Sequence, residues 1–379
     1  MVTLTIDGKK IMIRKLSTVL DAVRKLNIPL PTLCHHPSLT PFGGCRLCIV
    51  EIKGLARPVT ACTTPVNEGM EVTTTSPALE KMRRTTLELI LSDHPNDCMV
   101  CEKTGNCTLQ ELAYFYGVKE NRFMGERRKY KKRDNNPFVE RDMEKCILCG
   151  QCVRICDEVQ GVGAIDFIHR GFRTKISPPY ERDLNCEFCG QCVAVCPTGA
   201  LTGKMWGQEG RQNLKEIDTV CSYCGCGCSL TISVRRNKII RVSSRPETIN
   251  EGWLCPKGRF GYGFVHSPER LTKPLIRIAP KEQSAEVTPS LTLPPRGGGQ
   301  GWGGDSSLVT HHSSLFREAS WDEALDYVAS KMKGIKEKYG SDSIAGLASA
   351  RCTNEENYLF QKYMRAAIGT NNVDHCARY

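Results

Sequence analysis

The spacing of apolar and polar residues near the N-terminus changes from a period of two to the period of a helix. Residues 2–13 alternate around Asp7-Gly8, which predicts a β-hairpin. Helical spacing follows with Ser17 as the expected N-cap, at Val19, Leu20, Val23 and Leu26. A second helix is predicted over Pro77–Ser92, with inward positions at Leu79, Met82, Leu89 and Ile90.

Strand and helix patterns alternate again in the second half of the chain. Residues 230–234 and 239–242 flank Arg236-Asn237, which predicts another hairpin. Residues 278–315 are rich in Gly, Pro, Ser and Thr, so we expect a disordered insertion without a catalytic role. The patterns beyond it predict a β-α fragment that needs a larger sheet: a helix over Trp321–Lys336, a strand over Ser343–Ala348 and a helix from about Asn354 to Ala367.

Cysteine is unusually abundant, with 22 among 379 residues, and most cysteines lie two or three residues apart. Thiols grouped in this way bind metals in reducing compartments and do not form disulfide frameworks. The N-terminal residues show no export signal, and no apolar run approaches the ~20 residues of a membrane span. We therefore expect a soluble, cytoplasmic protein of several domains.

The formal net charge of +11 comes in part from one basic run, which contains Arg127, Arg128, Lys129, Lys131, Lys132 and Arg133. No aromatic platform or nucleic-acid motif accompanies this run. We therefore expect a solvated linker or docking face and no nucleic-acid site.

Two cysteine runs of identical spacing form an internal repeat. Both read C-x2-C-x2-C-x3-C, and they lie 40 residues apart. In two-cluster ferredoxins the fourth cysteine of each run binds the other cluster. One [4Fe–4S] cluster is therefore expected on Cys146, Cys149, Cys152 and Cys196. The other is expected on Cys186, Cys189, Cys192 and Cys156. Zinc or a disulfide is the alternative that this spacing disfavours.

Three further groups have four candidate ligands each. They are Cys34, Cys45, Cys48 and Cys62; His94, Cys98, Cys101 and Cys107; and Cys221, Cys224, Cys228 and Cys255. Such sets suit an iron–sulfur cluster or tetrahedral zinc, and spacing alone leaves the metal open. A lone histidine after a helix is more often structural, whereas a ligand role for His94 would raise the potential of its cluster, because imidazole is neutral. His35 and His36 are interpreted as packing or surface residues, and Cys226, Cys352 and Cys376 have no assigned ligand role.

These groups resemble the domains of known electron-transfer proteins. The Cys34 and His94 groups resemble the β-grasp [2Fe–2S] domain and the one-His, three-Cys [4Fe–4S] site of the large complex I iron–sulfur subunit and of many iron-only hydrogenases. The Cys221 group, with Pro256-Lys257-Gly258 after its last cysteine, resembles the N-terminal [4Fe–4S] domain of molybdenum and tungsten bis-pterin oxidoreductases. The resemblance implies that Lys257 lies between that cluster and the proximal pterin and assists electron transfer between them.

The segment from Ala348 to Tyr379 closely resembles formate dehydrogenase catalytic subunits. In that family the next residues are the metal-ligating cysteine or selenocysteine and a catalytic histidine, which this sequence lacks. We expect an in-frame UGA codon after Tyr379, with a frameshift or a contig end as alternatives. The chain as written is expected to lack formate oxidation.

The sequence thus predicts a multidomain α+β chain. The expected segments are a β-grasp [2Fe–2S] domain (1–78), a His/Cys-ligated [4Fe–4S] domain (79–118), a basic linker (119–140), a two-[4Fe–4S] ferredoxin domain (141–205), a bis-pterin-type [4Fe–4S] domain (217–277), the insertion (278–315) and an incomplete α/β fragment of a molybdopterin domain (316–379).

The function implied by the resemblance is the electron-transferring part of a formate dehydrogenase. Formate would be oxidised to CO2 at a molybdenum or tungsten bis-molybdopterin guanine dinucleotide. Electrons would then pass through one [2Fe–2S] and four [4Fe–4S] clusters to a flavin- and NAD-binding subunit, or to a hydrogenase module. The alternatives are a complex I-type large subunit without chemistry of its own and a stand-alone electron carrier. An iron-only hydrogenase is rejected, because the Cys221–Lys257 motif stands where its active-site domain would be.

Overall fold

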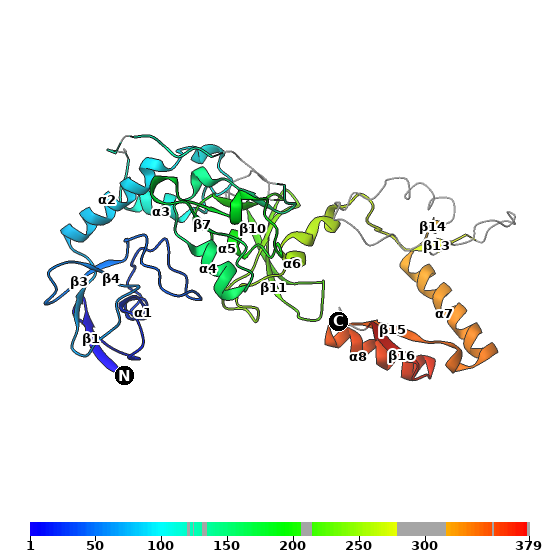
Figure 1. Ribbon diagram of the computed structural model, residues 1–379. Coiled ribbons are helices and arrows are strands. Elements are labelled where there is room, and N and C mark those ends of the chain that lie inside the picture. The colour runs from blue at the N-terminus through cyan, green and yellow to red at the C-terminus, as the bar shows by residue number, and fades with distance from the viewer. Residues whose placement is uncertain are drawn as a thin grey trace. The chain divides into compact units, whose positions relative to one another are not determined.

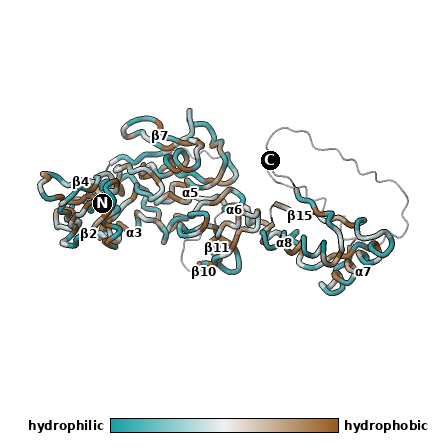
Figure 2. Tube along the Cα trace, turned by 90° about the horizontal axis from the view of Figure 1, so that it is seen from below, coloured by the Kyte–Doolittle hydropathy of each residue, from teal (hydrophilic) through white to brown (hydrophobic). Residues whose placement is uncertain are grey.

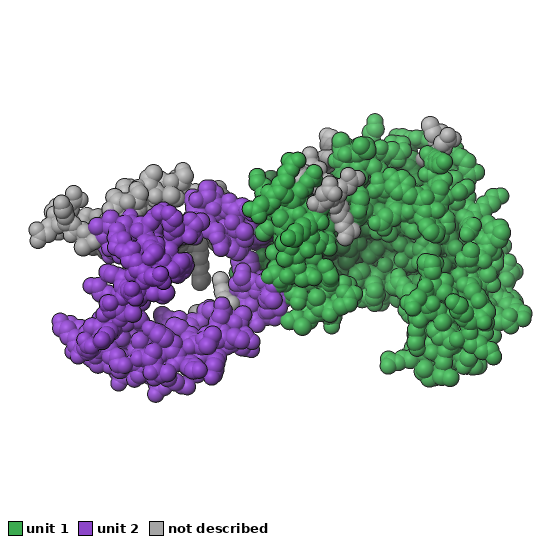
Figure 3. All heavy atoms as spheres, turned by 180° about the vertical axis from the view of Figure 1, so that it is seen from behind, with its two compact units in different colours: residues 1–219, 229–260 green, residues 220–228, 261–379 purple. Residues whose placement is uncertain are grey.

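The computed structural model describes residues 1–119, 122–123, 125–130, 135–205, 214–278, 316–350 and 352–376. The chain divides into two compact units, which Figure 3 colours separately: residues 1–219 with 229–260, and residues 220–228 with 261–379. The predicted insertion, apart from its first residue, lies outside the described residues, as do Lys131, Lys132 and Arg133 of the basic run.

Unit 1 begins with a mixed five-stranded sheet packed around one helix (Figure 1). The sheet has the order β2-β1-β5-β3-β4, and β1 pairs parallel to β5. The elements are β1 (Val2–Ile6), β2 (Lys9–Ile13), α1 (Val19–Lys25), β3 (Ile49–Ile52), β4 (Val59–Thr60) and β5 (Glu71–Thr73). The first hairpin turns at Asp7 and Gly8, which both have positive φ, as its sequence predicted.

The N-cap of α1 is Thr18, so the prediction of Ser17 was wrong by one residue. The Asp21 N–H donates to Thr18 Oγ1 at 3.2 Å, and the Asp21 carboxylate accepts the Thr18 N–H at 2.8 Å. This reciprocal capping box satisfies two backbone donors that the first turn leaves free. Ser17 lacks a partner three residues on that could complete the box.

Helix α2 (Pro77–Asp93) buries Leu79 and Leu87 and half-buries Ile90, but Met82 and Leu89 are exposed, contrary to prediction. Arg83 is buried instead. Its guanidinium donates to the carbonyls of Leu47, Ile49 and Thr74 at 3.1, 2.6 and 2.7 Å. An arginine whose guanidinium has backbone acceptors can therefore occupy a buried position that hydrophobic periodicity does not identify.

The next part of unit 1 is built from two similar short helices and two strand pairs. Its elements are η1 (Cys98–Val100), α3 (Thr108–Phe115), β6 (Val139–Arg141), η2 (Met143–Lys145), α4 (Gln151–Arg154), η3 (Ile155–Val159), β7 (Asp166–Ile168), η4 (Gly171–Arg173), β8 (Lys175–Ser177), η5 (Pro179–Glu181), α5 (Gln191–Val195) and β9 (Leu201–Gly203). Strand β6 pairs with β9 and β7 with β8, both antiparallel. Gly150 and Gly190, both in the left-handed region, precede α4 and α5, so the repeat in sequence is also a repeat in structure.

Arg128 differs from the solvated side chain expected in the basic run. It pairs with the Asp93 carboxylate, and it donates to the carbonyls of Cys146 and Thr174 at 3.0 and 3.2 Å. Its side chain is only 12% exposed. This residue therefore anchors the linker beside one of the cysteine loops.

A three-stranded sheet of order β10-β11-β12 completes unit 1, together with a short helix. The elements are β10 (Lys215–Val220), β11 (Ser229–Arg235), β12 (Lys238–Ser243) and α6 (Pro256–Phe260). Arg236 and Asn237 have positive φ between β11 and β12, which confirms the second predicted hairpin.

Unit 2 contains η6 (Gly261–His266), β13 (Leu275–Arg277), β14 (Phe316–Glu318), α7 (Trp321–Tyr339), β15 (Gly346–Ser349), α8 (Asn354–Tyr363), η9 (Met364–Ile368) and β16 (Val373–Cys376). Both predicted helices are confirmed, and the predicted strand lies slightly later, at β15. Strand β16, which the sequence did not suggest, pairs parallel to β15 across α8. Figure 2 shows apolar and polar segments alternating along α7.

Arg277 in β13 pairs directly with Phe316 in β14. The described residues on either side of the predicted insertion are therefore neighbours in one strand pair. Among the described helices, none combines the length and the apolar character that crossing a membrane would require.

Candidate iron–sulfur centres

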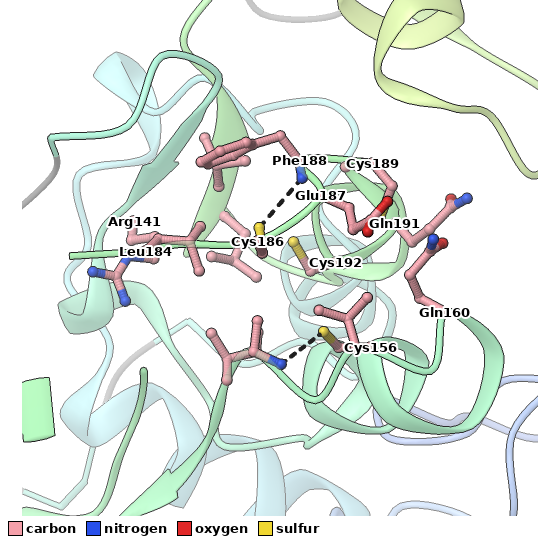
Figure 4. Close-up of a pocket in the computed structure, with 16 residues that line it drawn as sticks. Arg141, Cys156, Gln160, Leu184, Cys186, Glu187, Phe188, Cys189, Gln191 and Cys192 are labelled. Carbon is pink, nitrogen blue, oxygen red and sulfur yellow. Dashed lines mark hydrogen bonds between the residues drawn. The ribbon is translucent and has the colours of Figure 1, made fainter. Parts of the chain in front are cut away.

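The eight cysteines of the internal repeat line two separate cavities. Cys146, Cys149, Cys152 and Cys196 line one. Cys156, Cys186, Cys189 and Cys192 line the other. Figure 4 shows the sulfurs of Cys156, Cys186 and Cys192 pointing into the space between them. Each cavity thus receives three cysteines from one run and one from the other, because α4 and α5 pack together within one core.

The loops around these cavities aim backbone donors at sulfur. Leu148 and Phe188, at equivalent positions, both have positive φ. Their N–H groups donate to Cys146 Sγ at 3.4 Å and to Cys186 Sγ at 3.3 Å. Such bonds stabilise thiolates and tune the potential of a bound cluster.

Burial in these cavities disfavours the ionised form of the cysteine thiols when no metal is bound. Burial raises the pKa of Cys146 to about 11 and that of Cys192 to about 12, and it raises the pKa of Cys152 well above its ordinary value. A bound metal centre would supply the positive charge that compensates their ionisation. The residues therefore fit a cluster held by four thiolates.

The Cys34 group forms two close pairs. Cys34 lies beside Cys45, and a hydrogen bond between them raises the pKa of Cys34 and lowers that of Cys45 to about 6. Cys48 and Cys62 form a second pair of the same kind. The Cys45 N–H also donates to Cys34 Sγ at 3.4 Å. Two thiol pairs match the needs of a two-iron cluster, in which each iron takes two protein ligands.

His94 ends α2, and its side chain is buried. Within the described part of the chain, His94 Nδ1 has no hydrogen-bond partner. Burial lowers the pKa of His94, which favours the neutral imidazole that can bind a metal. Burial raises the pKa of Cys98 and of Cys107, and in each case the nearby Cys101 adds to the effect. A buried nitrogen without a partner, followed in the sequence by three cysteines, fits a ligand role.

The Cys221 group is divided between the two units. Cys221, Cys224 and Cys228 lie in unit 2, and Cys255 lies in unit 1. The Cys221 N–H donates to the Cys228 carbonyl at 2.8 Å, and the Gly225 N–H donates to the Ala350 carbonyl at 3.4 Å. This loop therefore rests on the chain that follows β15. Lys257, on α6, is exposed, as is Cys255.

Within the described residues, no three His, Cys, Asp or Glu side chains form a group that could hold a single metal ion. His36, interpreted as a packing residue, stacks obliquely on Trp253 with ring centroids 5.6 Å apart. His35 Nδ1 lies 3.1 Å from the Arg24 guanidinium.

Family models match successive segments of the chain. In order they are a 2Fe-2S iron-sulfur cluster binding domain (1–77), the NADH-ubiquinone oxidoreductase-G iron-sulfur binding region (83–122), the ferredoxin-like domain of NADH-quinone oxidoreductase subunit 3 (136–202), the molybdopterin oxidoreductase Fe4S4 domain (214–267) and molybdopterin oxidoreductase (270–379).

Similar proteins agree with these models. A solved structure of an NAD+-reducing [NiFe]-hydrogenase in the H2-reduced state matches at 32% identity over 54% of this chain and 88% of its own, with a TM-score of 0.51. This chain belongs to the family of complex I-like NADH-quinone oxidoreductase G subunits and molybdopterin oxidoreductases. The family carries iron–sulfur electron-transfer domains.

Two curated members of this family align with the whole chain. The NADPH-Fe(3+) oxidoreductase subunit alpha of Geobacter sulfurreducens is 40% identical, and the NADH-quinone oxidoreductase G 2 subunit of Rhizobium meliloti is 36% identical. The chain spans about 40% of the length of each.

Sequence reasoning missed several polar residues that connect the candidate centres. Gln151 and Gln191 stand at equivalent places in the two C-G-Q-C segments, and Arg154 and Arg259 lie near them. The repeated glutamine was visible in the sequence. Its hydrogen-bond partners were not, because they come from distant segments.

Proposed function

We propose that this chain binds one [2Fe–2S] and four [4Fe–4S] clusters and serves as the electron relay of a formate-oxidising, molybdopterin-type oxidoreductase. The observation that carries the relay is the sorting of the eight repeat cysteines into two four-cysteine cavities. Cavities of this composition, with backbone donors aimed at sulfur, suit one-electron carriers.

The proposed ligands follow the groups described above. The paired thiols of the Cys34 group support a [2Fe–2S] site, and the buried His94 nitrogen supports a mixed His/Cys site. For the fourth [4Fe–4S] cluster we propose Cys221, Cys224, Cys228 and Cys255. Support for this set comes from the match to the molybdopterin oxidoreductase Fe4S4 domain, which contains all four.

Formate is proposed as the substrate because the residues from Ala348 onward resemble formate dehydrogenases. Oxidation of formate gives CO2, one proton and two electrons. A molybdenum or tungsten pterin, when bound, would supply that chemistry. The role proposed for this chain is to carry the two electrons away one at a time, with Lys257 between pterin and cluster.

A flavin- and NAD-binding partner is proposed as the acceptor. The hydrogenase that matches this chain is NAD+-reducing, and the curated relatives are named for NADPH and NADH chemistry. The second candidate is a complex I-type subunit without a substrate of its own, which the 36% identity to an NADH-quinone oxidoreductase G 2 subunit favours.

The iron content tests the proposed relay, and the electron donor for viologen reduction distinguishes formate oxidation from the complex I-type function. The anaerobically purified chain should contain about 18 irons with matching acid-labile sulfide, as the proposed cluster types require. Zinc in place of iron would contradict the relay. The protein from its natural source, purified with its associated subunits, should reduce benzyl viologen with formate. Viologen reduction by NADH but not by formate would favour the complex I-type function.

A further inference from the structure

The glutamine in each C-G-Q-C segment makes the same contact outside its own loop. Gln151 Nε2 donates to the Leu33 carbonyl at 2.7 Å, and Gln191 Nε2 donates to the Leu254 carbonyl at 3.2 Å. Leu33 immediately precedes Cys34, and Leu254 immediately precedes Cys255. One type of hydrogen bond, made twice, therefore ties each half of the repeat to the backbone beside a cysteine of another candidate cluster.

Both contacts are shielded from water. Gln151 and Gln191 are 6% and 4% exposed, and Leu33 and Leu254 are 1% and 3% exposed. Water cannot compete for a hydrogen bond between a buried amide and a buried carbonyl. Such a bond therefore holds the two backbone segments that it joins in one arrangement. Each glutamine also immediately precedes a cysteine of its own cavity, Cys152 or Cys192. Each glutamine is thus next in sequence to a candidate ligand of one cluster, and it is hydrogen-bonded to the residue that precedes a candidate ligand of another cluster.

A guanidinium reinforces each of the two junctions. Arg154 Nη2 donates to the Cys34 carbonyl at 2.6 Å. At the other junction Arg259 Nε donates to the Cys189 carbonyl at 3.1 Å, and its Nη2 donates to Gln191 Oε1 at 2.9 Å. The amide of Gln191 is therefore oriented from one side by Arg259, which leaves its NH2 group directed at Leu254.

The glycines before the two glutamines allow the close approach. A Cβ at Gly190 would lie 2.4 Å from Arg259 Cδ and 2.8 Å from the Phe260 ring. A Cβ at Gly150 would lie 3.0 Å from the Phe167 ring and 3.5 Å from the Phe42 ring. In each half of the repeat, the glycine before the glutamine thus lets a neighbouring segment approach closely.

We propose that Gln151 and Gln191 are equivalent positioning residues for electron transfer between clusters. Gln151 fixes the Cys34 cluster relative to the cluster on Cys146, Cys149, Cys152 and Cys196. Gln191 fixes the segment that carries Cys255 relative to the cluster on Cys156, Cys186, Cys189 and Cys192. The proposal rests on the cluster assignments of the proposed function. Under this proposal, each half of the repeat binds a segment that carries a cysteine of a different cluster, and both halves use the same glutamine-to-carbonyl hydrogen bond.

The test uses the anaerobically purified, cluster-loaded chain and the variants Gln151→Met and Gln191→Met. Methionine preserves the length of the side chain and removes the donor. Low-temperature electron paramagnetic resonance of the reduced protein measures the spin–spin interaction of neighbouring clusters, and a redox titration gives each potential. We expect Gln151→Met to change the interaction of the Cys34 cluster and its neighbour only. Gln191→Met should change only the interaction that involves the Cys255 cluster.

Each variant is the control for the other, and Gln110→Met, on α3, controls for loss of a glutamine. Iron and sulfide per chain are measured for every protein, and Gln→Glu at both sites provides a second pair of variants if methionine reduces cluster content. A wild-type chain without clusters would overturn the proposed function. A loaded wild type whose variants leave both interactions as in Gln110→Met, or change both interactions equally, would overturn this inference alone.

Discussion

Arg83 is a buried cation whose hydrogen bonds to Leu47, Ile49 and Thr74 join α2 to the first domain. Arg83→Met would leave these buried carbonyls without their donor. Each such loss costs about 1–3 kcal/mol, so we expect the local stability of β3 to fall by on the order of 3 kcal/mol. Native-state hydrogen exchange of the β3 amides measures this free energy.

The matched control is the neighbouring residue on the same helix. Arg84 is exposed, and its Nε donates to the Tyr116 carbonyl at 2.9 Å. Arg84→Met should change the same exchange free energy by less than about 1 kcal/mol. Equal effects of the two substitutions would contradict a special role for Arg83.

At the same scale, His94 tests the mixed-ligand site. His94→Cys should keep four irons at this site and move the potential to a more negative value, because an anionic thiolate replaces a neutral imidazole. His94→Ala should lose those irons. Iron analysis and a redox titration followed by electron paramagnetic resonance provide both readouts. The control is His36→Ala, at a histidine near Cys34, which should leave the iron content unchanged. If iron were lost in His36→Ala and kept in His94→Ala, His36 and not His94 would be the ligand.

Among the elements, α1 has a start that can be tested residue by residue. Thr18→Ala removes the cap and should destabilise the first domain by about 1 kcal/mol. Ser17→Ala should have almost no effect, since the Ser17 side chain is not the cap. Urea unfolding monitored by circular dichroism compares the two variants with the wild type. A larger loss for Ser17→Ala would restore the cap position that the sequence suggested.

At the scale of the whole molecule, the fourth cysteine of each run lines the cavity of the other run. Cys156→Ser should therefore impair the cluster of the other run, on Cys186, Cys189 and Cys192. Cys196→Ser should impair the cluster on Cys146, Cys149 and Cys152. Mössbauer or paramagnetic resonance signatures of the two clusters, compared with Cys226→Ser, distinguish this exchange from ligation within each run. Damage confined to the mutated run would exclude it.

The cysteine spacing by itself determined a great deal of this protein. Most cysteines of the candidate groups lie two or three residues apart, so local sequence fixes their spacing, and the turn at Asp7-Gly8 follows from residues that tolerate positive φ. Helices with strong periodicity, such as α2 and α7, were predicted to within three residues at each end.

Tertiary structure decided what local pattern does not contain. The inward face of α2 depends on Arg83, whose carbonyl partners lie up to 36 residues away. The contacts of Gln151 and Gln191 reach 118 and 63 residues along the chain. A polar side chain can be buried only where distant groups satisfy it, and the sequence does not say which groups those are. The closely spaced cysteine runs are thus a local property of the chain, while the fourth cysteine of each cavity and the contacts between the candidate sites are set only when its segments pack together.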